Sequence, residues 1–301
     1  MTIDDVIAGV PAFAGKEVLV EPIEGGLTNA NFRLTVDGSR YCVRIPGKDS
    51  TLLAVDRQNE WRNTVAAAAS GAGARVAATV GDIPVMVLEW IEGEVQTGAA
   101  LREDAAVPKM AAAIRRLHAG PSFVNDFNMF RIAEGYLAIV RDRSFPIPAD
   151  YERYRPLARR IEEAMAVRGA ESRPCNNDLL AANYIDTPDG FRIIDYEYAG
   201  MNDPCFELGN TWAESELSER QLGVLVGEYF GEELVNRVAR ARLWSVMSNY
   251  GWTLWAAIQQ AVSDIDFDFW EWGIDGKYAR AVEAFESPEL ERWLEDVQRA
   301  D

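Results

Sequence analysis

The pattern of apolar residues changes near residue 94, and this change constrains the fold more than any other feature of the chain. Before it, short segments alternate between apolar and polar residues, as strands with one buried face do. After it, apolar residues recur at helical spacing over long stretches. Strands followed by helices predict an α+β protein. We therefore expect two lobes, an N-terminal lobe over 1–93 and a larger, mainly helical lobe over 94–301.

The N-terminal lobe is expected to be a five-stranded antiparallel sheet with one helix after the third strand. Asp37-Gly38 is a tight-turn signal between the second and third strands, and helical spacing over 51–71 stops at Gly71. The strands are expected at 16–23, 29–36, 40–46, 75–80 and 83–91. The helices of the second lobe are expected at 104–119, 128–142, 149–168, 203–214, 217–231, 233–262 and 288–299.

Composition and charge narrow the possible partners. The chain has 301 residues and a formal net charge of −18 at pH 7, which argues against nucleic acid, because a phosphate backbone needs a basic face. The same charge suits a small cationic substrate. No apolar run approaches the ~20 residues of a membrane span, so we expect no membrane partner. Nothing in the sequence indicates the oligomeric state.

The cellular compartment is predicted from the N-terminus and the cysteines. The acidic start MTIDDVIAGV lacks the basic segment of a signal peptide. The cysteines, Cys42, Cys175 and Cys205, are odd in number and have no CxxC spacing. Free thiols of this kind are typical of a reducing compartment, so we expect a cytoplasmic protein.

The only histidine, His118, excludes several mechanisms. Catalytic triads with a histidine base, and zinc sites with several histidines, would all depend on this one residue. His118 stands just before Gly120, which predicts the last turn of a helix, where a histidine is favourable. A general base, if the chain has one, is therefore expected to be a carboxylate.

Residues 173–200 gather asparagine and aspartate side chains between apolar runs. The segments NYID and FRIID flank the turn sequence TPDG, which predicts a hairpin. If the turn centres on Asp189, Asn183 lies opposite Asp195, and Asp178 lies on the loop that leads into the hairpin. Asparagine and aspartate also serve as turn and cap residues. Together, however, such oxygen-bearing groups are costly to bury unless they face a cation, so we predict a cation here.

Two segments resemble the catalytic motifs of a known family. NNDLLAAN followed by IIDYEYAG is similar to choline/ethanolamine kinases and the wider aminoglycoside phosphotransferase group, whose fold resembles that of protein kinases. The resemblance implies a protein-kinase-like two-lobe fold, with ATP and Mg²⁺ as cofactors. It implies Asp178 as the base that accepts the substrate hydroxyl proton, and Asn183 and Asp195 as magnesium ligands.

The resemblance extends to the N-terminal lobe. A glycine pair between strands is often only a turn, but choline kinase-like sequences carry a similar GGLTN, which implies phosphate contacts from the backbone here. Arg44 on the third strand and Glu60 on the following helix match the cation–carboxylate pair of the kinase fold, which takes part in catalysis, and a guanidinium can fork onto phosphate oxygens. The remaining nucleotide-binding residues that the resemblance implies are Gly25, Gly26, Leu27, Thr28 and Asn29 at the turn and Glu89, Trp90 and Ile91 at the segment that would bind adenine.

The chain departs from the family pattern at two positions. Asn176 stands where the family has a histidine, and Glu207 stands where relatives usually have an aspartate. Both family residues support the catalytic loop. These departures favour a third possibility besides a kinase of amino alcohols or of another acceptor, namely a nucleotide-binding pseudokinase.

The acceptor is predicted from aromatic residues near the C-terminal end of the helix over 233–262. Trp252 and Trp255 are three residues apart and share one helix face, with acidic residues following them. Aromatic faces beside carboxylates bind quaternary ammonium groups, although tryptophans at this spacing are more often core residues. Choline kinases show a similar arrangement. The resemblance implies an acceptor site made of Trp252, Trp255, Phe267, Trp272, Glu197, Tyr198 and Glu214.

This acceptor site favours a small cationic amino alcohol as the substrate. Choline is expected first and ethanolamine next. An aminoglycoside or a sugar is the alternative acceptor, for which scattered carboxylates and fewer aromatic walls would be expected.

Overall fold

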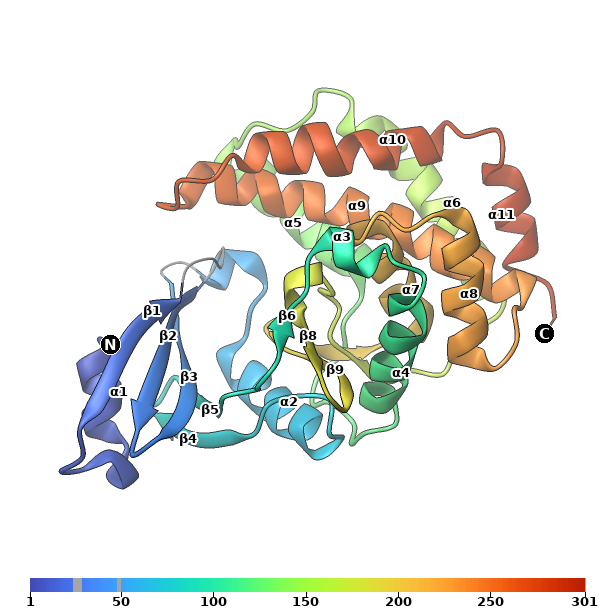
Figure 1. Ribbon diagram of the computed structural model, residues 1–301. Helices are drawn as coiled ribbons and strands as arrows, with labels where there is room; N and C mark the ends of the chain where they lie inside the picture. The colour runs from blue at the N-terminus through green and yellow to red at the C-terminus, as the bar shows by residue number, and fades with distance from the viewer. Residues whose placement is uncertain (24–28, 48–49, 301) are drawn as a thin grey trace.

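The computed structural model describes residues 1–23, 29–47 and 50–300. Figure 1 shows a small N-terminal sheet beside a larger helical part. As predicted, the sheet has five antiparallel strands, and the structure places them in the order β1-β2-β3-β5-β4. Their bounds are β1 (Val18–Ile23), β2 (Asn29–Val36), β3 (Ser39–Pro46), β4 (Val76–Val80) and β5 (Val85–Glu89).

Local sequence explains the bounds of these elements. Asp37 and Gly38 have φ of 49° and 79°, which is the two-residue turn that this pair favours between strands. The predicted helix is α2 (Arg57–Ala69), and it begins at Asp56, whose side chain accepts hydrogen bonds from the backbone of Gln58 and Asn59. The first residues of the predicted range instead form part of a short 3₁₀ turn, η2 (Ser50–Leu53).

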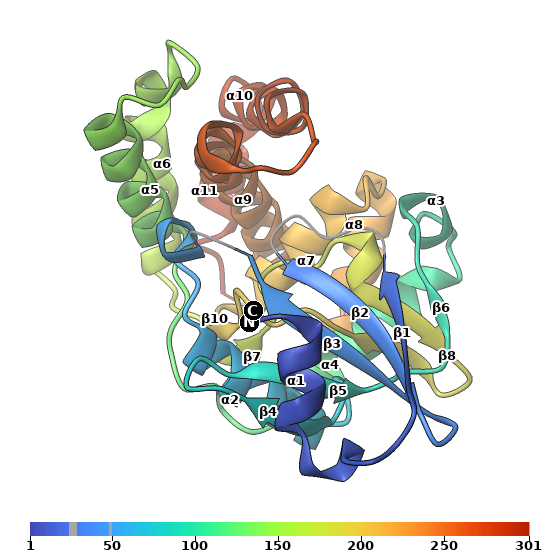
Figure 2. The same ribbon diagram turned by 90° about the vertical axis from the view of Figure 1, so that its left-hand side faces the viewer.

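The face of the sheet turned away from the helical part is covered by the N-terminus. Figure 2 shows α1 (Ile3–Gly9) in front of the sheet. Val6, Val10 and Phe13, from α1 and the turn η1 (Pro11–Phe13), pack against apolar side chains of the strands. The sequence analysis did not predict α1, because seven residues are too few to show a helical period.

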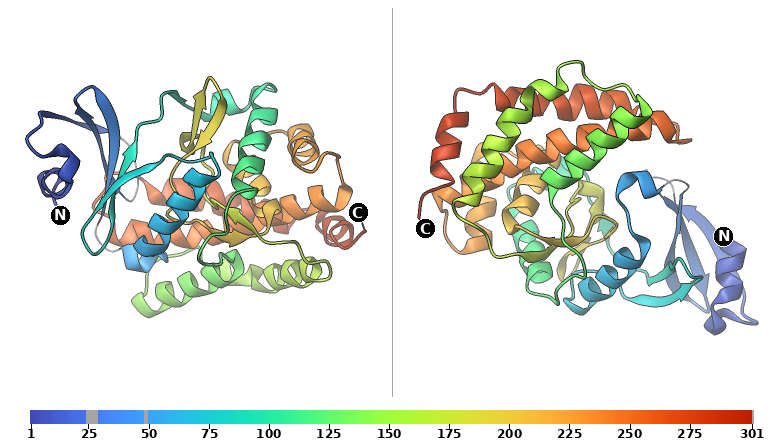
Figure 3. Two further views of the ribbon diagram at one scale, coloured as in Figure 1. Left: turned by 90° about the horizontal axis from the view of Figure 1, so that it is seen from below. Right: turned by 180° about the vertical axis from the view of Figure 1, so that it is seen from behind.

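The C-terminal part is built around one long buried helix. This helix, α9 (Val235–Val262), packs against α5, α7 and α10, and the helices on either side of it are visible in Figure 3. The other helices are α3 (Gly98–Leu101), α4 (Ala106–His118), α5 (Met129–Arg143), η3 (Tyr151–Tyr154), α6 (Arg155–Ala166), η4 (Ala181–Asn183), α7 (Pro204–Glu214), α8 (Glu219–Phe230), the π-helix η5 (Glu271–Tyr278), α10 (Ala279–Phe285) and α11 (Leu290–Asp296).

Each of the seven helices predicted for this part is present, with shifted ends. The structure adds α3, η5 and α10, which the sequence analysis missed. Glycines at 273 and 276 interrupt the helical signal of η5. No helix among the described residues is both long and apolar enough to cross a membrane.

Two small sheets frame the polar segment. β6 (Glu94–Val95), β8 (Tyr184–Thr187) and β9 (Gly190–Ile193) form one, and β7 (Arg173–Cys175) pairs with β10 (Gly200–Asn202) in the other. The predicted hairpin is therefore present, but part of its sheet, β6, lies just after the N-terminal lobe.

The predicted register of the β8–β9 hairpin is wrong by one residue. Tyr184 pairs with Ile193 and Thr187 with Gly190, so the turn holds two residues and does not centre on Asp189. Ile194 N donates to Asn183 O at 3.0 Å, which places Ile194, not Asp195, opposite Asn183. The reason lies in Gly190, whose φ of 99° lets the chain enter β9 directly after Asp189.

Candidate active site

Two residues with left-handed backbone shape the predicted catalytic-loop region, which we define as residues 176–183 and 194–195 and call the loop. Asn177 has φ of 69° and Asp195 has φ of 66°, a region that asparagine and aspartate tolerate better than most residues. Asn177 turns the chain after β7, and Asp195 turns it after β9. Asp195 therefore leaves the hairpin ladder by its own backbone conformation rather than by strand pairing.

Asn176 joins these two turns. Its Nδ2 donates to Ile194 O at 3.2 Å and to Asp195 O at 2.7 Å, and its Oδ1 accepts from Asp178 N at 3.0 Å. One buried amide thus holds the segment of Asp178 against that of Asp195. This is the loop support that the family assigns to a histidine at this position.

Asp178 is bonded to Asn176 and Asn183 through its backbone, and its carboxylate takes part in neither hydrogen bond. Its backbone carbonyl accepts from Asn183 Nδ2 at 2.7 Å, so the amide oxygen of Asn183 is the atom left to act as a ligand. Burial, together with the charges of Asp195, Glu214 and Glu197, raises the pKa of Asp178 well above its usual value. A carboxyl with a raised pKa is suited to accepting a proton.

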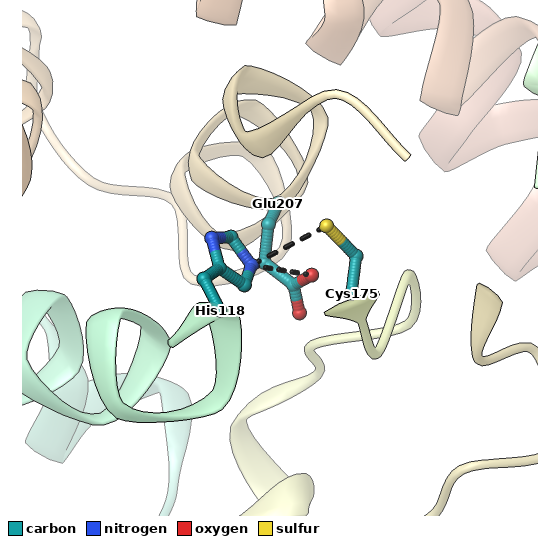
Figure 4. Close-up of side chains that lie close together, drawn as sticks. All are labelled: His118, Cys175 and Glu207. Atoms are coloured by element: carbon teal, nitrogen blue, oxygen red, sulfur yellow. Dashed lines mark hydrogen bonds and ion pairs between the residues drawn. The ribbon is translucent and has the colours of Figure 1, made fainter. Parts of the chain in front are cut away.

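A buried cluster lies behind the loop (Figure 4). His118 ends α4, as predicted, and its Nε2 lies 3.3 Å from both Glu207 Oε2 and Cys175 Sγ. The Glu207 carboxylate also accepts from Asn176 N at 3.1 and 2.9 Å. Histidine, cysteine and glutamate can bind a metal, but both Glu207 oxygens are already bonded to the loop backbone. We therefore assign the cluster to support of the loop.

Glu207 stands in this cluster where the family has an aspartate, and its longer side chain reaches both His118 and the backbone nitrogen of Asn176. Glu207→Asp should lower the free energy of unfolding by about 1–3 kcal/mol, because a side chain one methylene shorter cannot keep both Asn176 N and His118 bonded. Urea unfolding would measure the loss. Glu207→Gln keeps the length and one acceptor oxygen, so it should lose less. Wild-type stability in Glu207→Asp would show that these contacts are dispensable.

The predicted pair Arg44 and Glu60 is present but long. Arg44 Nη2 lies 3.9 Å from Glu60 Oε1 and only 2.5 Å from Asp195 Oδ1. Burial acts to lower the pKa of Arg44, but the carboxylates of Asp195, Glu60 and Glu197 outweigh it and raise the pKa. Arg44 therefore connects the sheet to the loop through Asp195 more closely than it connects to α2.

Arg57, which the sequence analysis missed, takes the closer place beside Glu60. Its Nη1 lies 2.7 Å from Glu60 Oε2 and 3.2 Å from Glu197 Oε2. Asn29 Nδ2 also donates to Glu197 Oε2 at 3.1 Å. Glu197, predicted for the acceptor, is thus bonded to residues of β2 and α2. Burial and the charge of Asp195 raise the pKa of Glu197 to about 7.

A pocket of about 190 Å³ lies between the sheet and the loop. Its lining includes the predicted nucleotide residues Arg44, Glu89, Trp90 and Ile91, together with Asp195. A mainly apolar lining with a few polar groups is typical of small-molecule sites, and this volume is enough for only part of a nucleotide. The predicted phosphate-binding residues Gly25, Gly26, Leu27 and Thr28 lie outside the described residues.

The predicted aromatic residues lie together. Trp252 contacts Tyr198 with ring centroids 4.9 Å apart and Trp255 at 6.5 Å, and Trp272 contacts Trp255 at 5.6 Å and Phe267 at 6.4 Å. Trp255 Nε1 donates to Tyr198 OH at 2.6 Å. Trp252 and Trp255 are 4% and 5% exposed, whereas Phe267 is 37% exposed. These five rings, which we call the aromatic group, form one connected set of ring contacts.

Glu214, the predicted acidic partner of the acceptor, is bonded inside the protein. The ammonium group of Lys277 pairs with its carboxylate, and the same Nζ lies 4.3 Å from the centroid of the Trp272 ring. No signal in the sequence marked Lys277, because it lies in the π-helix that the sequence analysis did not predict.

Comparison with known proteins identifies the family. Residues 19–244 match the phosphotransferase enzyme family. The chain is 27% identical to ethanolamine kinase 2 of Mus musculus over 310 residues, which cover 90% of this chain and 80% of that protein. It is 25% identical to protein LicA of Haemophilus influenzae, with 78% and 72% covered, and 26% identical to thiamine kinase of Shigella boydii serotype 4, with 77% and 81% covered.

A solved structure extends the likeness to the whole chain. The crystal structure of a choline/ethanolamine kinase family protein from Mesorhizobium loti superposes with a TM-score of 0.85 and 31% identity, covering 99% of each chain. The expected protein-kinase-like α+β fold is confirmed by this likeness. With a family match over most of the chain and a relative this similar, the chain belongs to the phosphotransferase enzyme family and, within it, to the choline/ethanolamine kinase family.

Proposed function

We propose that this protein transfers the γ-phosphoryl group of ATP to the hydroxyl of a small amino alcohol, with choline as the favoured acceptor and ethanolamine next. The observation that carries the proposal is the place of Asp178. Asn176 binds the backbones of Asp178 and of Asp195, which lines the pocket, and Asn177, the residue before Asp178, binds the backbone of Tyr198 in the aromatic group. A base between a nucleotide site and a cation site suits transfer between the two.

The loop residues carry out the transfer in this proposal. Asp178 accepts the proton of the acceptor hydroxyl while the hydroxyl oxygen forms a bond to the γ-phosphorus of ATP. The bond between the γ-phosphorus and the β–γ bridging oxygen breaks, which releases ADP. Arg44 places a fixed positive charge, 10% exposed, beside the phosphate end of the pocket. The adenine of ATP would lie against Glu89, Trp90 and Ile91. Glu60 Oε1 lies 3.9 Å from Arg44 Nη2 and helps to position the Arg44 side chain.

The chemistry of the donor set fits Mg²⁺. Asn183 offers an amide oxygen, since its nitrogen is used on Asp178 O, and Asp195 offers a carboxylate held by Arg44 and by the bond from Asn176 to its backbone. Hard oxygen ligands of this kind are what magnesium takes from proteins, with waters and phosphates completing the shell. Bound there, Mg²⁺ would offset the negative charge that develops on the phosphate oxygens.

In this proposal the two predicted lobes bind different substrates. Residues 1–93 supply the nucleotide side, and residues 94–301 supply the loop and the acceptor side, with the reaction taking place in the cytoplasm. Thiamine, the substrate named for one relative, is a second candidate acceptor, because it also combines a primary alcohol with a cationic nitrogen. Thiamine contains two rings, so it would need more room around the aromatic group than the acyclic choline does.

ADP release with Mg-ATP across an acceptor panel tests the proposal. The panel holds choline, ethanolamine, thiamine, an aminoglycoside and a sugar, with a blank that lacks an acceptor. We expect choline to give the highest kcat/KM and phosphocholine as the product. Stimulation by the aminoglycoside or the sugar alone would contradict the amino-alcohol assignment. Metal-dependent ATP binding without turnover on any acceptor would support the pseudokinase.

The aromatic group predicts a change in substrate preference when one ring is removed. Trp252→Leu should lower kcat/KM for choline by about ten-fold, because a desolvated cation–π contact contributes roughly 1–2 kcal/mol. Ethanolamine should lose less, since a primary ammonium can also donate hydrogen bonds to carboxylates. Steady-state kinetics with both amines gives the ratio.

A second tryptophan of α9 provides the matched control. Trp244 is equally buried but packs against Phe130 and Phe206, outside the aromatic group, and its Nε1 donates to Asp203 at 2.8 Å. Trp244→Leu should lower stability without changing the choline-to-ethanolamine ratio. Equal losses on both amines in Trp252→Leu would assign Trp252 to the core alone.

A further inference from the structure

The acceptor side of the site already contains a cation, the ammonium group of Lys277. The Lys277 side chain is 1% exposed and pairs with Glu214, whose side chain is 6% exposed. Its Nζ also lies over the Trp272 ring, 4.3 Å from the centroid. A carboxylate together with an aromatic face is the arrangement expected to bind the ammonium group of an amino alcohol. Lys277 therefore takes the contacts that the acceptor would need.

The π-helix explains why the lysine reaches this place. In a π-helix each turn closes between residues five apart, and such turns are frequent at functional sites. Trp272 and Lys277 are five residues apart in η5, so one turn stacks the ammonium over the ring.

Close packing holds this turn against α9. The helix that follows it, α10, runs beside α9 in Figure 1. A Cβ on Gly273 would lie 2.1 Å from Ala256 Cβ, so only glycine permits the approach. This packing fixes the backbone of η5 beside α9, so the Lys277 ammonium can leave Glu214 and Trp272 only by a change in its own side-chain torsions.

The charges allow one cation in this position but not two. Burial lowers the pKa of Lys277, and the carboxylate of Glu214 opposes that effect. One ammonium neutralises the buried Glu214 carboxylate. A second would have to pair with Asp178, the other buried carboxylate that acts on Lys277, and the proposed transfer needs that carboxylate as a free base. Exchange of one ammonium for another keeps the carboxylate paired throughout.

We propose that Lys277 is a tethered competitor of the acceptor: an amino alcohol binds by displacing the lysine ammonium from Glu214 and Trp272. The inference rests on the proposed function, since it assumes a cationic acceptor. It assigns Lys277 to the control of acceptor affinity, with no part in the transfer of the phosphoryl group. Without an acceptor, the lysine keeps the site neutral and closed.

Removing the lysine amine should therefore tighten acceptor binding. Lys277→Met should lower KM and Kd for choline by about ten-fold, the factor expected if the lysine occupies the site about nine-tenths of the time. KM for ATP should change by no more than about two-fold, and kcat is compared at the pH optimum of each protein, because the Lys277 charge acts to lower the pKa of Asp178. Steady-state kinetics and calorimetric titration with choline measure these quantities. Lys277→Gln, whose amide can still donate to Glu214, should act in the same direction and covers the case in which Lys277→Met does not fold.

Lys109 offers a matched control. It combines the same two partners, a carboxylate and a ring, since its Nζ lies 2.9 Å from Asp186 Oδ2 and 5.3 Å from the centroid of Phe191. It is, however, 46% exposed and lies on α4, away from the aromatic group. Lys109→Met should leave choline binding unchanged.

Amine labelling of the wild-type protein tests the displacement directly. With an acylating reagent and mass spectrometry, Lys277 should be protected in the free protein and modified when choline is bound, whereas Lys109 should be modified equally in both. Continued protection of Lys277 with choline bound, or unchanged choline affinity in both Lys277 variants, would overturn the inference and leave the proposed function standing. Failure of the wild type and all variants to bind any amino alcohol would overturn both.

Discussion

Replacing Asp178 by asparagine should lower kcat by about 10²–10⁴-fold and leave ATP affinity within about two-fold of the wild type. The carboxylate is lost as a proton acceptor, while the size and position of the side chain are kept. The backbone of Asp178 is held by Asn176 and Asn183 side chains, and neither bond involves the carboxylate. The loop should therefore keep its shape in Asp178→Asn.

Stability provides a second measurement on the same variant. Because burial and neighbouring carboxylates raise the pKa of Asp178, its charged form is unfavourable in the folded protein. A neutral amide avoids this cost, so the melting temperature of Asp178→Asn should equal or exceed that of the wild type. Loss of activity with gain of stability is the pattern expected of a catalytic group.

The control for Asp178→Asn is the same substitution at a partly exposed aspartate outside the predicted site, Asp186. Asp186 lies on β8 and pairs with Lys109 at the surface. Asp186→Asn should keep wild-type kcat. Near-normal turnover in Asp178→Asn, measured as ADP release with choline, would show that another group is the base.

The sequence predicted the parts of the fold that depend on local signals. Asp37-Gly38 determined a turn that the structure contains, and the alternation before residue 94 located all five strands of the sheet. Contacts between distant segments left no comparable signal. Arg57 is three residues before Glu60, a spacing common to many surface pairs, yet the structure buries both beside Glu197, 137 residues further along the chain than Glu60.

The hairpin register shows why the predicted ladder partner of Asn183 was wrong by one residue. The sequence analysis brought Asn183 and Asp195 together as partners across the ladder. In the structure the ladder places Ile194 opposite Asn183, and the left-handed backbone of Asp195 turns that residue toward Arg44. A backbone dihedral of this kind depends on the bonds from Asn176 and Arg44, which come from elsewhere in the chain.

The π-helix η5 is a second part of the structure that could not be predicted from the sequence. Helix signals in a sequence follow a period near 3.6 residues, and a π turn breaks that period. Trp272 could be predicted only by resemblance, and Lys277 could not be predicted at all. The residue that we propose as a competitor of the acceptor therefore lies in the segment with the weakest local signal.

Asp195→Asn should weaken Mg-ATP binding by at least the ~10–100-fold that loss of a metal's outer-shell partner costs. The substitution removes a charged ligand and keeps a side chain that tolerates the left-handed φ of 66°. Alanine at this position would add backbone strain to the loss of the ligand, so asparagine separates the two effects. Calorimetric titration with Mg-ATP measures the change.

ATP without magnesium provides the comparison that isolates the metal. Asp195→Asn leaves Glu89, Trp90 and Ile91 in the pocket lining unchanged, so the adenine of ATP should bind as before. Arg44 loses its partner at 2.5 Å and keeps Glu60 at 3.9 Å, which leaves its positive charge more available to phosphate oxygens. Metal-free ATP should therefore bind the variant as well as or better than the wild type, while Mg-ATP binds it worse. Mg-ATP affinity equal to that of the wild type would remove Asp195 from the metal site and leave it as the partner of Arg44 alone.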